Sequence, residues 1–284
     1  GKAYFYKGDF DEAIKTFSFI KNEYQKNEIY FRASLWLVRG FVEKGDFSSA
    51  ELELEEILKN KRFPDNLEKK VAVVAANYYV KKEDYSAAIE ELKNATKLIK
   101  RKRKKVRLNY ILAQLYQESN NYTLAQKHYD LVLKSSPEYE MAFNAKMNLA
   151  RSLEGGNSDT KKMREKLLKM IKDGKNKEYL DQIYFTIAEM DINSKDTASA
   201  TKNYLLSTTN SADNNSQKSL SFLALGKINF ERSLYKLAKT YYDSTIFYMD
   251  TDSRLYNQAN ERHLVLSSLI TNINTVELQD SLQM

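Results

Sequence analysis

The feature that most constrains the fold of this chain is a pattern that recurs every 37 or 38 residues. In each copy a short polar turn is followed by an anchor residue, which is aromatic in five copies and threonine in two. The anchors are Phe10, Phe47, Tyr85, Tyr122, Thr160, Thr197 and Tyr235. Periods of about 20 to 50 residues are the signature of repeat architectures, in which each copy is one supersecondary unit.

The spacing within each copy predicts a pair of helices. Three residues after the anchor comes a small or medium residue: Ala13, Ala50, Ala88, Ala125, Met163, Ala200 and Ala238. Four residues further comes a large apolar residue: Phe17, Leu54, Leu92, Tyr129, Leu167, Tyr204 and Tyr242. Steps of three and four place these residues on one face of a helix. Nine residues before most anchors lies a small residue, Ala76, Ala113, Ala188 or Gly226, with Val38 as the exception. We expect it to let the two helices approach closely.

Composition agrees with an all-α fold without a catalytic centre. The 284 residues include only 8 glycines and 2 prolines, which favours long helices joined by short loops. The chain has no cysteine, which excludes disulfides and thiol catalysis. Its two histidines, His128 and His263, are far apart in sequence, and no phosphate-binding glycine motif is present. We therefore expect neither an enzyme nor a metal site, and no cofactor.

The copy at residues 107–137 resembles the tetratricopeptide repeat most closely. The residues that carry the resemblance are Leu112, Ala113, Tyr116, Tyr122, Ala125, Tyr129 and Pro137. The resemblance implies an all-α superhelical solenoid of about seven to eight helical hairpins with a concave groove. It also implies protein partners rather than a small-molecule substrate.

The fifth copy is the weakest and contains the pair Gly155 and Gly156. Glycine ends a helix readily because it adopts positive φ at little cost. One interpretation is a hinge near 154–160 between N-terminal repeats (1–155) and C-terminal repeats (156–284) of one continuous solenoid. The alternative is a loop one residue longer than in the other copies. A second polar stretch, 210–216, is expected to be exposed and mobile.

In the tetratricopeptide family the groove is lined by first-helix residues roughly fifteen, twelve, eight, five and four positions before the anchor. Carried onto this chain, those positions include Leu35, Val42, Val73 and Val80. The predicted protein-binding residues are Arg32, Arg39, Lys70, Asn77, Lys81, Arg107, Tyr110 and Gln114. This mixture suits an extended or helical segment with acidic groups. The alternative is that these side chains are solvated helix faces without a ligand.

One basic run explains the net charge of +7. It comprises Lys100, Arg101, Lys102, Arg103, Lys104 and Lys105, and Arg107 follows after Val106. Such a patch could contact nucleic acid, an anionic membrane or an acidic protein, or it could be a solvated linker between repeats. Nucleic acid is the less favoured partner, because few aromatic residues accompany the run.

Several stretches resemble the large repeat-containing outer-membrane lipoprotein of the type IX secretion and gliding-motility machinery (the PorW/SprE family). They are residues 136–145, 178–185, 205–208, 262–266, 272–275 and 279–282. The resemblance implies a scaffold at the periplasmic face of the outer membrane, with secretion-machinery components as partners. Membrane attachment would come only through a lipid anchor outside this segment. A cytoplasmic peptide-binding co-chaperone or regulator remains the alternative.

Overall fold

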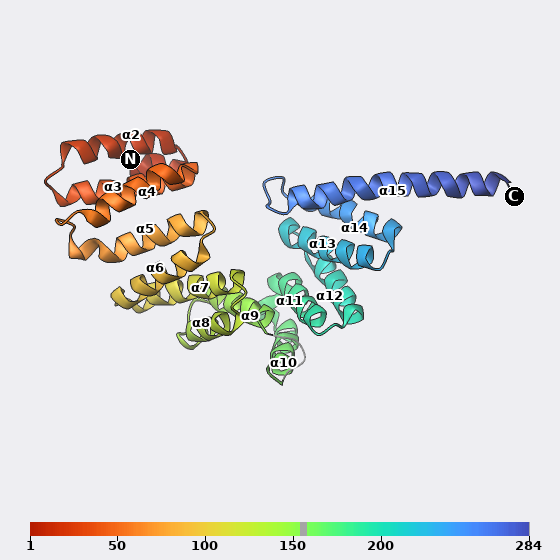
Figure 1. Ribbon diagram of the computed structural model, residues 1–284. Helices are drawn as coiled ribbons and strands as arrows, with labels where there is room; N and C mark the ends of the chain where they lie inside the picture. Colours follow the sequence, from red (N-terminus) through yellow and green to blue (C-terminus); the bar gives the residue numbers. More distant parts are fainter. Residues whose placement is uncertain (154–157, 284) are drawn as a thin grey trace. The chain divides into compact units, whose positions relative to one another are not determined.

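The structure is a computed structural model that describes residues 1–153 and 158–283. These residues form fifteen α-helices and two short 3-10 helices, and no β-strand occurs among them (Figure 1). The chain divides into two compact units, unit 1 over Gly1–Ser152 and unit 2 over Leu153–Met284. The predicted all-α fold class is confirmed.

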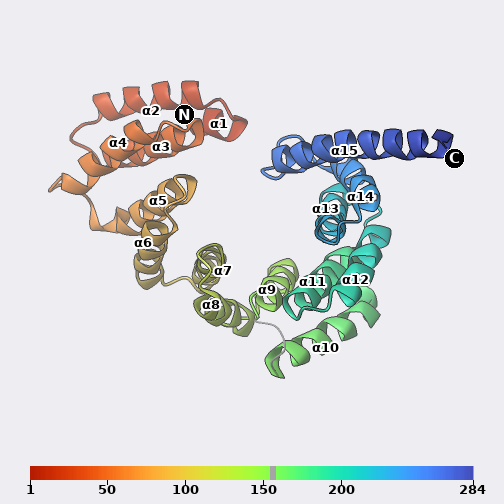
Figure 2. The same cartoon turned by 45° about the vertical axis from the view of Figure 1, so that its right-hand side comes forward.

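Unit 1 consists of hairpins in which a first helix, the A helix, is followed by a second, the B helix. The A helices are α1 (Lys2–Lys7), α3 (Glu28–Lys44), α5 (Glu68–Lys81), α7 (Lys102–Glu118) and α9 (Tyr139–Arg151). The B helices are α2 (Phe10–Glu23), α4 (Phe47–Lys59), α6 (Tyr85–Leu98) and α8 (Tyr122–Lys134), and a 3-10 helix, η1 (Asp65–Leu67), precedes α5. Figure 2 shows α5 and α7 on one side of the row and α6 and α8 on the other, so unit 1 has two helical layers.

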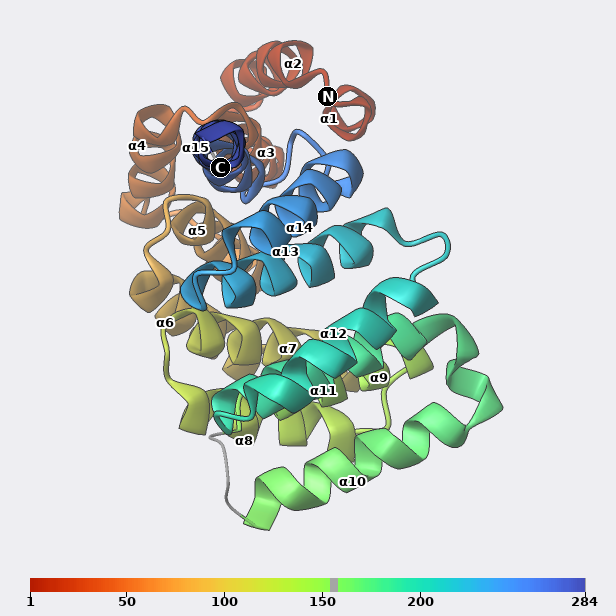
Figure 3. The ribbon, with the colours of Figure 1, turned by 90° about the vertical axis from the view of Figure 1, so that its right-hand side faces the viewer.

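Unit 2 continues the same pattern. It contains α10 (Ser158–Lys172), η2 (Gly174–Tyr179), α11 (Leu180–Asn193), α12 (Thr197–Asn210), α13 (Asn215–Glu231), α14 (Tyr235–Tyr248) and α15 (Tyr256–Gln283). The pairs α11–α12 and α13–α14 are hairpins, α10 packs along α11, and α15 packs on α14 (Figure 3). No helix within 1–153 or 158–283 is both long and apolar enough to cross a membrane.

The sequence anchors mark the starts of the B helices. Six of them are the first residues of α2, α4, α6, α8, α12 and α14. The alanine three residues later is 0% exposed in all six hairpins. The large residue four positions further is at most 6% exposed in every copy, Leu167 of the fifth included. The helix pairing and its register, read from the spacing, are therefore confirmed.

A recurring backbone geometry closes six of the hairpins, and only two of these turns use glycine. The residue two positions before the anchor has φ between 56 and 85°: Gly8, Gly45, Glu83, Asn120, Lys195 and Ser233. In five of the six turns the next residue is Asp or Asn and its side chain caps the B helix, whereas Leu234 makes no side-chain cap. In the second hairpin, the N–H of Asp46 donates to the Phe41 carbonyl at 2.9 Å, and the Asp46 carboxylate accepts from the Ser49 N–H at 3.1 Å. Asp46 thus provides hydrogen-bond partners for a backbone carbonyl at the end of the A helix and for a backbone N–H at the start of the B helix.

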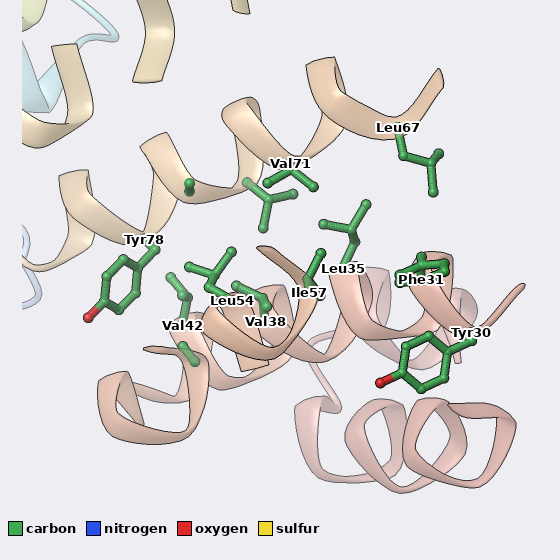
Figure 4. Packing of buried hydrophobic residues seen from close by; sticks show 13 residues of the cluster. Tyr30, Phe31, Leu35, Val38, Val42, Leu54, Ile57, Leu67, Val71 and Tyr78 are labelled. Atoms are coloured by element: carbon green, nitrogen blue, oxygen red, sulfur yellow. The ribbon is translucent and has the colours of Figure 1, made fainter. Parts of the chain in front are cut away.

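The cores lie between successive hairpins. Figure 4 shows Leu35 and Val38 of α3 and Leu54 of α4 facing Val71 and Tyr78 of α5. A single hairpin could not bury these side chains, and the next A helix covers them. This is the reason that such repeats are stable only as an array.

The fifth repeat is divided between the two units. Its A helix, α9, belongs to unit 1, and its B helix, α10, belongs to unit 2. Met163 of α10 stands where six other copies have a fully buried alanine, and it is only partly buried. Residues 154–157 lie outside the described residues, so the predicted hinge near 154–160 stays a prediction.

The predicted exposed loop at 210–216 is partly buried. Ser211 is 1% exposed, and its hydroxyl donates to the Asp181 carboxylate at 3.2 Å. Asn214 donates to the same carboxylate at 3.0 Å, and the Gln182 N–H donates to its other oxygen at 2.8 Å. Asp181 is itself 1% exposed, and a buried carboxylate requires hydrogen-bond donors. Its hydrogen bonds to Ser211 and Asn214 therefore hold the loop against α11.

Candidate protein-binding surface

The predicted binding residues lie on α3, α5 and α7 in unit 1. Arg32, Lys70, Lys81, Arg107 and Gln114 are exposed, and Arg39, Asn77 and Tyr110 are half-buried. We call these eight residues together with Trp36 the A-helix face. Two other predicted lining residues, Leu35 and Val42, are buried instead. They are at most 5% exposed and belong to the core between α3 and α5.

Equivalent positions of neighbouring A helices contact one another. Lys81 of α5 forms an ion pair with Glu43 of α3 at 3.2 Å, and the two residues are 38 positions apart. Asn148 of α9 donates to the Tyr110 hydroxyl at 3.2 Å, again over 38 positions. Helix α3 is therefore aligned with α5, and α7 with α9. Burial raises the pKa of Tyr110, so its hydroxyl remains a neutral hydrogen-bonding group at physiological pH.

One repeat position carries a positive charge in three consecutive A helices. Arg32, Lys70 and Arg107 each lie fifteen residues before their anchor, and all three are exposed. Arg32 pairs with Glu28 at 2.7 Å. The hydrogen bond from Arg32 is the main reason that the pKa of Glu28 is lowered, and the charge of Lys70 adds to the effect. The face therefore has more cations than acidic partners.

Trp36 is the residue of this face that the spacing rule missed. It lies between Arg32 and Arg39 on α3, directly after Leu35, and it is half-buried. The Arg39 guanidinium carbon is 4.8 Å from the Trp36 ring centroid, and Lys2 Nζ is 5.5 Å from it. The sequence signal was the single tryptophan flanked by arginines four residues before and three residues after it.

The basic run lies at the start of α7. Its six residues at 100–105 are exposed, and Lys102 begins the helix. Arg101 occupies the N-cap without a side-chain hydrogen bond, and no acidic residue lies in the first turn. Arg103 contacts Glu138 in an ion pair. Cations at this end of a helix oppose the helix dipole, so the arrangement costs stability rather than adding to it.

The described residues contain no cluster of side chains that could hold a metal ion. No group of three or more histidine, cysteine, aspartate or glutamate side chains able to hold a metal occurs among them. His128 packs on the ring of Tyr116, and its Nδ1 lies 2.9 Å from the Asn109 amide oxygen. Burial lowers the pKa of His128, which fits a neutral packed side chain. His263 lies elsewhere, on α15, with Nδ1 2.9 Å from Asp243.

Comparison with known proteins supports the repeat assignment. A family model described as tetratricopeptide repeat matches residues 106–139. No curated protein matches the sequence significantly. Among solved structures, the apo quorum sensor NprR from B. thuringiensis is 16% identical, with a TM-score of 0.58 over 95% of this chain and 82% of NprR.

Two further structures have the same type of fold. The apo form of RapI is 16% identical, with a TM-score of 0.57 over 88% of this chain and 77% of RapI. A Rap protein complexed with Competence and Sporulation Factor is 15% identical, with a TM-score of 0.57 over 97% of this chain and 91% of that protein. Residues 106–139 are thus a tetratricopeptide repeat, and the predicted tetratricopeptide-type helical solenoid is confirmed.

Proposed function

We propose that this chain is a non-enzymatic protein-interaction scaffold whose A-helix face binds an extended acidic segment of a partner protein. The observation that carries the proposal is the exposed cation at the same repeat position of α3, α5 and α7, namely Arg32, Lys70 and Arg107. Packed helices such as α3 and α5 lie about 8 to 10 Å apart. An extended chain advances about 3.3 Å per residue, so a carboxylate at every third residue matches this spacing.

The fold supports peptide binding in general. A structure of NprR in complex with its cognate peptide NprX and the Rap complex with Competence and Sporulation Factor both contain this type of helical array. Those ligands belong to those proteins. For this chain, they support the proposal that helical repeats of this type can bind a peptide.

The test is titration of a fluorescent, capped peptide of Leu-Glu-Ala repeats, followed by anisotropy at low and physiological salt. We expect the triple variant Arg32→Gln, Lys70→Gln, Arg107→Gln to bind about 10-fold or more weakly, since each exposed ion pair contributes roughly 0.2 to 1 kcal/mol. A matched control removes three exposed B-helix lysines, Lys97, Lys127 and Lys134. Equal losses in both variants, or no binding by the native chain, would contradict the proposal.

For the cellular role, we propose an internal segment of an outer-membrane lipoprotein that supports type IX secretion and gliding motility at the periplasmic face. The support is the sequence resemblance over stretches such as 136–145 and 262–266; none of the structures reported above is of that family. Capture of envelope proteins on the immobilised chain tests it. Recovery of secretion-machinery components supports this role, and their absence from repeated captures contradicts it.

The alternative role is a cytoplasmic peptide-binding co-chaperone or regulator. The match to NprR in complex with its cognate peptide NprX favours it. Family members that hold a terminal carboxylate use a paired lysine and asparagine; here Asn77 is in place, but Val73 replaces the lysine. The affinity for a peptide with a free C-terminus, compared with the affinity for its amidated form, distinguishes the regulator from the secretion scaffold. Binding that requires the free carboxylate favours the regulator.

A third hypothesis is that the basic run binds nucleic acid. The exposed residues 100–105 are the observation that supports it. Binding to a DNA duplex should then weaken steeply with salt, and neutralising the run should abolish it. If the neutralised variant loses protein partners instead, the run contacts an acidic protein.

A further inference from the structure

The single tryptophan of the chain lies beside two cations that have no carboxylate partner. Arg39 and Lys2 approach the Trp36 ring to 4.8 and 5.5 Å, and neither forms an ion pair within residues 1–153 and 158–283. The positive charges of Arg39 and Lys2 repel each other. Their attraction to the Trp36 ring offsets only part of that repulsion. An anion that bridges Arg39 and Lys2 would remove it.

The acidic residues on the same side of α3 are already engaged. Glu28 pairs with Arg32, and Glu43 pairs with Lys81. Neither carboxylate therefore neutralises Arg39. The guanidinium keeps its planar fork of N–H donors available for a carboxylate from outside the chain.

The ring of Trp36 is held in a fixed orientation. Phe17 stacks on it with ring centroids 5.6 Å apart and planes 12° apart. Phe5 meets it edge-on at 5.2 Å, and Tyr6 meets it edge-on at 5.8 Å. Tyr6 is 76% exposed and forms a rim beside the site. A rigid, half-buried ring offers apolar contact at little entropic cost.

We infer that Trp36, Arg39 and Lys2 form an anchor site for a peptide carboxylate that lies next to an apolar side chain. The carboxylate bridges the two cations, and the apolar group packs on Trp36 and Tyr6. This inference rests on the proposed function, because it places one end of the acidic segment on α3. It excludes a simple inorganic anion as the preferred ligand, since such an anion leaves the aromatic surface uncovered.

The emission of Trp36 tests the inference directly, because no other tryptophan contributes to it. The probe is the capped Leu-Glu-Ala repeat peptide, with a Leu-Gln-Ala counterpart and inorganic phosphate as comparisons. We expect the acidic peptide to shift or quench the emission with the same midpoint as its anisotropy. The glutamine peptide and phosphate should leave the emission unchanged at equal concentration.

Variants separate this site from the rest of the A-helix face. Arg39→Gln and Lys2→Gln should each weaken peptide binding about fivefold or more, while Lys7→Gln, an exposed lysine of α1, changes it less than twofold. Peptide binding without an emission change, or without an effect of Arg39→Gln and Lys2→Gln, overturns the anchor site and leaves the proposed function intact. An equal response to phosphate overturns the peptide as ligand. Absence of peptide binding by anisotropy overturns both.

Discussion

In α13 the backbone of Gly226 lies directly against the ring of Tyr242 in α14. A Cβ atom at position 226 would come within 3.0 Å of two ring carbons of Tyr242, which is 3% exposed. The two positions are nine residues before and seven residues after the anchor Tyr235. The same two positions meet at the start of the chain, where a Cβ on Gly1 would come 2.6 Å from Phe17. The close approach is therefore a property of the repeat.

This contact predicts that residue sizes at the two positions compensate each other. Gly226→Leu should destabilise unit 2 by about 2 kcal/mol or more, because the core has no room for it. Adding Tyr242→Leu should recover part of the loss. Gly226→Ala should stay within about 1 kcal/mol of the native chain, since Ala113 occupies the same position opposite Tyr129. Urea unfolding of the native chain, these three variants and Tyr242→Leu alone measures this, and additive losses in the double variant would contradict the pairing.

The hairpin turns predict a stabilising substitution. Lys195 has φ of 61°, which costs a residue with a Cβ roughly 1 kcal/mol. Lys195→Gly should therefore raise the free energy of unfolding by about 0.5 kcal/mol after the extra chain entropy of glycine is counted. Gly45→Ala, at φ 76° in the second hairpin, should lower it by about 1 kcal/mol. If both substitutions shift stability in the same direction, backbone strain is not the cause.

A charged contact ties α10 to α11 and α12. Asp191 is 5% exposed, its Oδ1 lies 3.0 Å from Arg164 Nε, and its Oδ2 accepts from Asn203 at 2.7 Å. Asp191→Ala should cost about 2 kcal/mol, because it leaves two donors without their acceptor; the partial exposure of Arg164 limits the loss. Hydrogen exchange should show faster exchange in α10. Asp213→Ala, an exposed acid of the same unit, should change neither quantity.

Tyr30 predicts a loss of stability at alkaline pH. Burial, and then its hydrogen bond to Glu56, raises the pKa of Tyr30 to about 12. The folded chain holds this proton more tightly than the unfolded chain, so the contribution is complete below about pH 10 and is lost between pH 10 and 12.

Urea unfolding between pH 8 and pH 11.5 measures the effect. Tyr30→Phe should flatten the alkaline fall, whereas Tyr6→Phe at the exposed rim should not. Lys21 acts in the same direction. Burial lowers its pKa, but hydrogen bonds to Glu56 and Glu53 outweigh burial and raise it. A slope unchanged in Tyr30→Phe would assign the alkaline loss to groups such as Lys21.

The sequence predicts the repeat geometry well because short-range rules determine it. Asp46 must cap α4, and Ala50 must be small, whatever the rest of the chain does. Glu83 and Lys195 show the limit, since a left-handed turn without glycine has no local signal. The turn forms there because the packed helices on either side fix it.

The binding surface depends on contacts between repeats, which the period alone does not contain. Position twelve before the anchor lies at the seam between adjacent A helices. Leu35 is apolar and is buried there by Val71 of α5, whereas Tyr110 at the same position stays half-exposed. A rule that counts residues cannot separate these outcomes, and for this reason it missed Trp36. Ser211 was missed for a similar reason, because its partner Asp181 lies 30 residues away.

The start of α7 predicts opposite effects of one substitution on stability and on binding. Lys102→Glu places an anion in a first turn that now holds only cations and has no side-chain cap. It should stabilise unit 1 by roughly 0.3 to 1 kcal/mol at low salt, and the gain should shrink at high salt. Lys134→Glu in the last turn of α8 should have the opposite sign. If 100–105 contacts an acidic partner, Lys102→Glu also weakens capture of that partner. Greater stability with unchanged capture would identify the run as a solvated helix start.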